Sequence, residues 1–161
     1  MEQSIFKSYD IRGIYPKELD KKIAFKIGQA FIEITGAKKV AVARDARLSG
    51  EELLKALTDG IMASGADVFD VGQVPTECLY FAVGGYDFDA GIMITASHNP
   101  KKYNGFKMLK KQGKDISIIR GKDLLSFLES FSKDKKVFSK KGGLVKKDIL
   151  QDFITHISSF S

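Results

Sequence analysis

Along the chain, short apolar runs alternate with longer segments in which apolar residues recur every three or four positions. The short runs have the length of buried strands, which we predict at residues 40–43, 66–72, 88–95 and 103–109. The recurring pattern is typical of amphipathic helices, which we predict at residues 18–35, 50–64, 124–131 and 149–157. Pro75 and Thr76, with Gly84 and Gly85 further on, predict a short helix at residues 76–83. Ser49, with Glu52 three residues later, predicts a capping box at the start of the second helix.

The alternation of strands with helices predicts the fold class. Strands that are apolar throughout are covered on both faces, as in α/β domains. We therefore expect a three-layer α/β/α sandwich around a mostly parallel, mixed sheet. Ligands of such sheets bind beyond the carboxyl ends of the strands. Polar clusters follow three of the predicted strands there, at residues 44–45, 72–73 and 95–99.

The composition is that of a globular protein. Of the 161 residues, 43% are hydrophobic and 29% are charged, which is enough apolar surface for one packed domain. No apolar run approaches the length of a membrane span, and the N-terminus lacks the apolar core of a secretory signal. Cys78 is the single cysteine, so no internal disulfide forms, which suits a reducing compartment. We expect a cytoplasmic protein without a membrane partner.

The net charge of +6 indicates a phosphate-bearing partner, either a nucleic acid or a small phosphorylated molecule. Much of the excess lies in residues 132–148, which hold seven lysines, no arginine and one aromatic residue, Phe138. Nucleic-acid surfaces usually combine arginine with stacking aromatics. We interpret this segment as a solvated loop and expect no nucleic-acid partner. A basic nucleic-acid-binding protein stays open as an alternative.

The end of the third predicted strand is unusual, because this buried strand runs directly into Thr-Ala-Ser-His-Asn-Pro at residues 95–100. Asn99-Pro100 favours a turn, in which Ser97 either bonds the turn backbone or acts as a nucleophile. Adjacent residues such as Ser97 and His98 rarely have the geometry of a catalytic dyad, and no third triad member is evident. The GxSxG motif is also absent, so the pattern disfavours a serine hydrolase.

Three segments together resemble the α-D-phosphohexomutase family, in its phosphomannomutase/phosphoglucomutase branch. TASHNPKKYNGFK at residues 95–107 resembles the phosphoserine loop of that family. YDIRG at residues 9–13 resembles a second landmark of the same domain. ARDARLSG at residues 43–50 resembles a third, with Ala43 where many members carry glycine. We interpret the charged residues of this third segment as structural, fixing the turn between strand and helix: Arg44, Asp45 and Arg47.

The resemblance implies an enzyme that interconverts hexose 1-phosphates and hexose 6-phosphates of mannose, glucose or both. In such an enzyme Ser97 carries a phosphoryl group and gives it to the free hydroxyl of a hexose monophosphate. A glucose or mannose 1,6-bisphosphate intermediate then returns its other phosphoryl group to the serine. The resemblance also implies that Arg12 and His98 contact the phosphoserine, that Lys107 is the acid/base, and that Tyr9 lies near the sugar. Mg²⁺ would bind through the phosphoryl group of Ser97.

The resemblance runs from Phe6 to about Ile157, but full-length members of the family have four domains. The aspartate-rich loop that holds the metal in their second domain has no match in these residues. We therefore expect residues 1–150 to form domain I and residues 151–161 to begin an interdomain helix, with the remaining domains absent. The partners would be a phosphosugar and the other domains, and the chain alone would be inactive. A stand-alone phosphosugar-binding or regulatory domain is the other alternative.

Overall fold

The computed structural model describes residues 3–130 and 140–160 of the chain. Position 131 of the fourth predicted helix, and residues 132–139 of the lysine-rich segment, lie outside these ranges. The strands are β1 (Ile11–Ile14), β2 (Lys39–Arg44), β3 (Asp67–Gln73), β4 (Ala90–Ile94), β5 (Tyr103–Gln112), β6 (Asp115–Ile119) and β7 (Leu144–Lys146). The helices are η1 (Gln3–Ile5, a 3-10 turn), α1 (Lys21–Thr35), α2 (Gly50–Ala63), α3 (Thr76–Gly85), α4 (Gly121–Ser130) and α5 (Leu150–Ser158).

In the described residues, seven strands form one mixed sheet in the order β1-β5-β4-β2-β3-β7, with β6 also paired to β5. Strands β4, β2, β3 and β7 run parallel to one another. Strand β5 is antiparallel to β4 on one side and to β1 and β6 on the other. The predicted α/β fold class, with helices on both sides of a mixed sheet, is confirmed.

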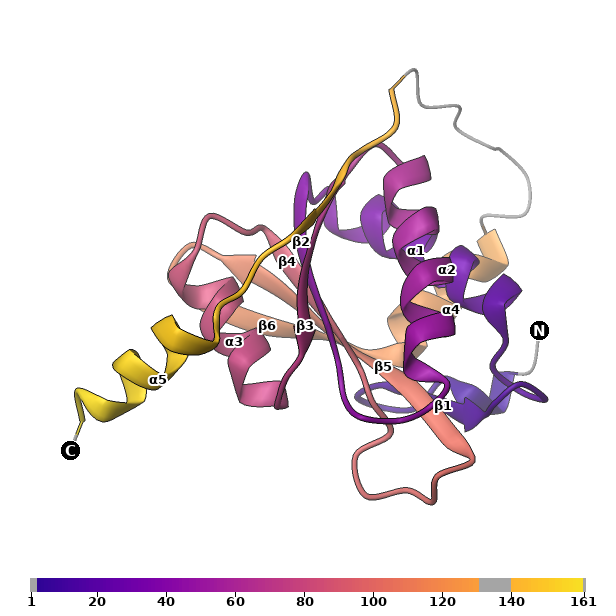
Figure 1. The fold of residues 1–161 in the computed structure, drawn as a ribbon. Coiled ribbons are helices and arrows are strands. Elements are labelled where there is room, and N and C mark those ends of the chain that lie inside the picture. The colour runs from indigo at the N-terminus through magenta and orange to yellow at the C-terminus, as the bar shows by residue number, and fades with distance from the viewer. Residues whose placement is uncertain (1–2, 131–139, 161) are drawn as a thin grey trace.

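Helices lie on both faces of the sheet (Figure 1), and the sheet separates two apolar cores, one on each face. On one face, Val40 and Val42 of β2 belong to the core that α1, α2 and α4 cover. On the other face, Ala41 and Ala43 of the same strand belong to the core that α3 covers. Successive side chains of a strand point to opposite faces, so a strand that is apolar at every position fits only a sheet covered on both sides.

Helix α1 begins and ends as its flanking residues predict. The side chain of Asp20 accepts a hydrogen bond from the N–H of Ile23 at 2.8 Å, which satisfies one of the free N–H groups of the first turn. At the other end, Gly36 adopts a left-handed conformation with φ of 65°, and its N–H donates to the carbonyl of Ile32.

The predicted capping box at the start of α2 is wrong. Ser49 makes no side-chain bond to the helix, and its hydroxyl accepts a hydrogen bond from the amide of Asn104 at 2.8 Å. Glu52 accepts a hydrogen bond from the hydroxyl of Tyr15 instead of turning back to the helix end. Residues that are distant in sequence have therefore taken both partners of the expected box.

Helix α5 contacts α3 through two aromatic side chains, Phe153 and His156, and the ring of His156 lies 5.0 Å from that of Phe81. Phe153 belongs to the edge of the second core and contacts Phe81 of α3, with ring centroids 5.6 Å apart. Beyond it, Ile154, Ile157 and Phe160 are exposed, and Figure 1 shows this yellow helix projecting away from the sheet. Within residues 3–130 and 140–160, no helix has the length and apolar character needed to cross a membrane.

Three segments that are distant in sequence meet at one end of the sheet. Residues 95–102 join β4 to β5, beyond the carboxyl end of β4. Because β2 lies beside β4, the connection from β2 to α2 runs next to them, and the N–H of Asp45 donates to the carbonyl of Ile94 at 3.0 Å. Strand β1 approaches across β5, where Arg12 pairs with Gly105.

Candidate active site

Ser97 occupies a strained turn beyond the carboxyl end of β4. Its φ is 52°, and among the described residues it is the one non-glycine residue with a positive φ. A left-handed conformation costs a residue with a Cβ about 1 kcal/mol or more. The turn is closed by hydrogen bonds from the N–H of Ser97 to Thr95 Oγ1 at 2.9 Å and from the N–H of Asn99 to the carbonyl of Ala96 at 3.1 Å. The half-buried Ser97 is therefore held in a defined conformation.

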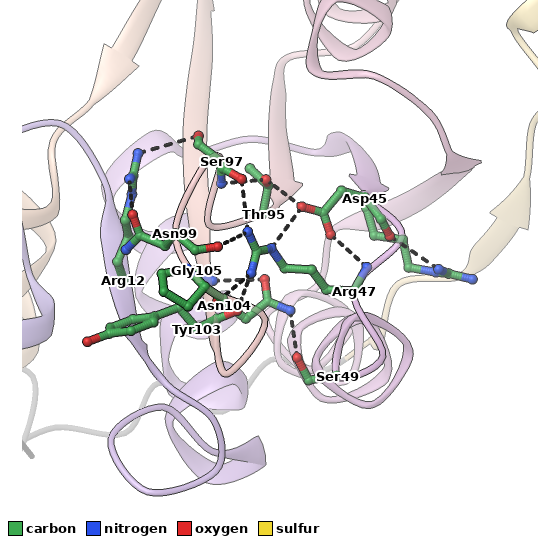
Figure 2. Close-up of polar contacts among 12 residues, drawn as sticks. Arg12, Asp45, Arg47, Ser49, Thr95, Ser97, Asn99, Tyr103, Asn104 and Gly105 are labelled. Carbon is green, nitrogen blue, oxygen red and sulfur yellow. Dashed lines mark hydrogen bonds and ion pairs between the residues drawn. The ribbon is translucent and has the colours of Figure 1, made fainter.

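Arg12 of β1 reaches the same turn (Figure 2). Its Nε and Nη2 both lie 2.7 Å from Oδ2 of Asp10, a carboxylate that is almost fully buried. Its Nη1 donates to the side-chain oxygen of Asn99 at 3.2 Å, and its Nη2 lies 3.4 Å from the hydroxyl oxygen of Ser97. The arrangement fixes a positive charge beside this hydroxyl. A phosphoryl group bound there would gain charge-assisted hydrogen bonds.

Arg47 is a residue whose place at this site the sequence-based interpretation missed. We interpreted it as fixing the turn after β2, yet its guanidinium also binds the turn that carries Ser97 (Figure 2). It donates to the backbone carbonyls of Ser97, Asn99, Pro100 and Tyr103. Asp45 joins this network, because its carboxylate accepts from both Arg47 and the hydroxyl of Thr95. Arg44 points elsewhere and donates to Gln73 of β3 at 2.9 Å.

In the described residues, no hydrogen bond joins the side chains of the other predicted site residues to Ser97. His98 follows it in the turn and is exposed. Tyr9 is 72% exposed. Lys107 is half-buried on β5, where it pairs with Met93 of β4. Among the described residues, the side chains of these three make no hydrogen bond or ion pair. Their roles stay predictions.

A hollow of about 800 Å³ lies beside the turn. Small-molecule sites in proteins usually measure about 300–1,000 Å³, so its size is suitable for a ligand. Positive and negative side chains both face it. Its lining consists of Ser4, Lys7, Asp10, Arg12, Glu18, Asn99, Pro100, Lys102 and Tyr103.

The oxygen atoms at this site do not suit a metal ion by themselves. In the part of the chain that the structure describes, no three His, Cys, Asp or Glu side chains gather as metal ligands would. The nearby carboxylates of Asp10 and Asp45 are already paired with arginines. Mg²⁺ prefers several oxygen ligands, mostly charged ones or water. A phosphoryl group on Ser97 would be the charged oxygen ligand that this turn offers.

Known proteins resemble this chain in sequence. Residues 3–128 match the family described as phosphoglucomutase/phosphomannomutase, alpha/beta/alpha domain I. A phosphomannomutase of Escherichia coli is 38% identical over 156 residues, which are 96% of this chain and 34% of that protein. A phosphomannomutase of Klebsiella pneumoniae is 39% identical over 150 residues, which are 92% of this chain and 96% of that protein.

The fold is also that of a solved relative. A phosphoglucomutase/phosphomannomutase family protein of Burkholderia thailandensis superposes with a TM-score of 0.85 and 40% sequence identity. The match covers 98% of this chain and 36% of that one. The chain thus spans about a third of the length of the Escherichia coli and Burkholderia proteins, and nearly all of the Klebsiella protein.

Proposed function

Because the chain belongs to the phosphoglucomutase/phosphomannomutase family, as its α/β/α domain I, we propose that it supplies the phosphoryl-carrying serine of a phosphohexomutase. Such an enzyme interconverts hexose 1-phosphates and hexose 6-phosphates. The observation that carries the proposal is the strained turn that holds the hydroxyl of Ser97 beside the guanidinium of Arg12. Phosphoryl transfer depends mainly on positioning and charge neutralisation, and this turn provides both.

The proposed activity belongs to a longer protein. Residues 1–150 would be its phosphoserine-loop domain, and residues 151–161 would begin a helix that leads to further domains. The exposed Ile154 and Ile157 of α5 support this division, because they belong to neither of the two apolar cores of the described residues. The partners are then a phosphosugar and the remaining domains. The single, buried Cys78 supports a cytoplasmic location.

The proposed reaction begins with a phosphoryl group on Ser97. The bond between phosphorus and the Ser97 oxygen breaks while a bond forms to the free hydroxyl of a hexose monophosphate. The hydroxyl loses its proton to a base, for which Lys107 is our candidate, and the Ser97 oxygen regains a proton. The resulting 1,6-bisphosphate, of glucose or mannose, reverses its orientation in the site. It then returns its other phosphoryl group to Ser97. Arg12 stabilises the negative charge on the transferred group throughout.

The remaining residues have less direct roles in this proposal. His98 and Arg12 contact the phosphoryl group, and Tyr9 lies close to the sugar. The phosphoryl group of Ser97 would hold Mg²⁺ on this domain, since a neutral hydroxyl is a poor ligand and phosphorylation adds close to two negative charges. Its other ligands come from outside the described residues.

Turnover by the Ser97→Ala variant of the full-length protein tests the proposal. With a hexose 1,6-bisphosphate present as activator, the wild-type protein should convert glucose 1-phosphate or mannose 1-phosphate to the 6-phosphate. The variant should lose nearly all of this conversion and keep its melting temperature. Near-normal conversion by the variant would refute the proposed function.

A further inference from the structure

All five N–H groups of the Arg47 guanidinium are used within the protein (Figure 2). Its Nε donates to Oδ2 of Asp45 at 3.2 Å. The other four N–H groups donate to backbone carbonyls, Nη2 to Ser97 at 2.8 Å and Asn99 at 2.7 Å, and Nη1 to Pro100 at 2.9 Å and Tyr103 at 3.0 Å. A guanidinium has five N–H donors in total, so Arg47 has none left for a substrate. The donors of Arg47 therefore stabilise the protein and are not available to bind a ligand.

Asp45 ties this guanidinium to the end of β4. Its Oδ2 accepts a hydrogen bond from the hydroxyl of Thr95 at 2.7 Å as well as from Arg47. The Thr95 oxygen in turn accepts from the N–H of Ser97 at 2.9 Å. The side chain of Arg47 is 13% exposed, so water competes little for these bonds. Charge-assisted hydrogen bonds in such surroundings are stronger than neutral ones at the surface.

The turn needs such a support because of the conformation of Ser97. With φ of 52°, the residue is in a region that side chains with a Cβ rarely adopt. In this conformation its hydroxyl oxygen lies 3.4 Å from Arg12. A change of φ to a negative value would redirect the Cα–Cβ bond and move the hydroxyl away from Arg12. Binding three carbonyls of the turn and the first carbonyl of β5 to one planar group opposes this change.

We propose that Arg47 is a positioning residue for Ser97. It does not touch the reacting atoms, and it holds the turn in the conformation that directs the oxygen of Ser97 toward Arg12. This inference rests on the proposed function of Ser97 as phosphoryl carrier. Lysine cannot take the same role, because an ammonium group has three donors and lacks the planar fork that reaches several carbonyls at once.

Arg44 provides a matched control. It is three residues away, carries the same charge and is also partly buried. Its hydrogen bonds go to the side chain of Gln73 and to the carbonyl of Asp45, and none goes to residues 95–103. Replacing Arg44 by Lys therefore changes the same residue type at the same sheet edge without touching the turn.

Kinetics of the full-length protein provide the first measurement. We expect Arg47→Lys to lower kcat about 100-fold, which is the typical cost of misplacing a reacting group by about 1 Å. KM for the hexose 1-phosphate should stay within about twofold, because the interaction does not involve bound substrate. Arg44→Lys should resemble wild type in both parameters. A normal kcat for Arg47→Lys, or a loss that appears in KM alone, would overturn the inference.

Backbone ¹⁵N relaxation of the 161-residue chain provides a second measurement that needs no catalysis. In wild type and in Arg44→Lys, the amides of Ser97 and Asn99 should have order parameters near 0.85, as rigid backbone does, and in Arg47→Lys they should fall below about 0.6. The amides of β4 should stay rigid in all three proteins. A rigid turn in Arg47→Lys would contradict the inference.

The two measurements separate this inference from the proposed function. If Ser97→Ala retains turnover while the turn of Arg47→Lys becomes mobile, Ser97 is not the carrier and Arg47 merely orders a turn, so both proposals fail. If Ser97→Ala is inactive and Arg47→Lys is fully active, the proposed function stands and the inference fails alone. Should Arg47→Lys not fold, Asp45→Asn weakens the same network from its other side, and the same outcomes decide.

Discussion

Two arginines meet the turn that carries Ser97, and each is bound by the aspartate two residues before it. Asp10 holds Arg12 at 2.7 Å, and Asp45 holds Arg47 at 3.2 Å. The first arginine faces the hydroxyl of Ser97, whereas the second faces backbone carbonyls. Because each guanidinium already has a carboxylate partner, little side-chain freedom remains to be lost during a reaction. The charges around Ser97 are therefore preorganised.

Replacing Arg12 by Ala in the full-length protein should lower kcat/KM about 100-fold or more, the usual loss when one preorganised donor is removed from a transition state. Asp10→Asn should cause a smaller loss, because the guanidinium remains but loses its charged partner. Lys114→Ala removes the same charge from the exposed turn between β5 and β6 and is the control. Equal kcat/KM values for Arg12→Ala and Lys114→Ala would contradict the role of Arg12.

Tyr15 should lose its proton late in an alkaline titration. Its hydrogen bond to Glu52 raises the pKa of Tyr15 from 10.0 to about 12, and burial with a bond to Asp152 raises the pKa of Tyr86 to about 12 as well. The raised pKa means that the Tyr15 bond stabilises the fold below pH 10 and that this contribution is lost as the pH rises through 12. Ultraviolet absorbance of tyrosinate measures the titration. Glu52→Gln should shift one late-titrating tyrosine toward pH 10, and an unchanged curve would refute the assignment.

At the scale of elements, α1 and α2 cross with their backbones in contact. A Cβ built on Gly28 would lie 2.4 Å from the carbonyl oxygen of Leu57, and one on Gly60 would lie 2.1 Å from that of Phe25. Both distances are too short for any residue other than glycine. The crossing matters for the site, because α2 begins directly after the segment that contains Arg47.

Gly60→Ala should therefore lower the free energy of unfolding by about 1–3 kcal/mol, the usual cost of overpacking in a core. Gly84→Ala is a control in α3, where the added Cβ would meet its nearest neighbour, a methyl group of Ile116, at an ordinary 3.6 Å. Because alanine favours helix, this change should raise the free energy of unfolding by about 0.5–1 kcal/mol. Urea unfolding of both variants measures the difference, and equal stability of the two would disprove the close crossing.

The elements that the sequence predicts are those whose pattern is local. Strands β2, β3, β4 and β5 and the helices have apolar periodicity that appears within their own residues. Strands β1, β6 and β7 escape prediction because they are short and partly polar, and β7 is exposed at all three positions. They form strands because β1 and β6 pair with β5, and β7 pairs with β3. A pattern within their own residues does not reveal such pairing.

The residues of the candidate site likewise fall into those that the sequence identifies and those whose role depends on distant contacts. Ser97 and Arg12 lie in segments that resemble known landmarks, so the sequence alone marks them. The contribution of Arg47 is hidden, because its carbonyl partners lie 50 to 56 positions away and a carbonyl group has no sequence signature. The capping box failed for a related reason, since Asn104 and Tyr15 bind its two members across long stretches of chain.

At the scale of the whole molecule, each face of the sheet has its own core of buried side chains. This is the basis for independent folding. We expect the 161-residue chain to melt in one cooperative transition. We also expect it to show no conversion of glucose 1-phosphate, because it spans only about a third of the length of the Escherichia coli and Burkholderia relatives. Calorimetry and a coupled assay test the two halves of this prediction. Sustained conversion by the purified chain, lost in Ser97→Ala, would contradict the second half.

The central claim is that Ser97 carries the phosphoryl group, and its occupancy during turnover tests this most directly. The full-length protein and its Ser97→Ala variant would be incubated with glucose 1,6-bisphosphate, digested and mapped by peptide mass spectrometry. We expect one phosphoryl group per chain, located on Ser97 and absent from the variant. A protein that turns over while Ser97 stays unmodified, or that carries the group on another residue, would contradict it.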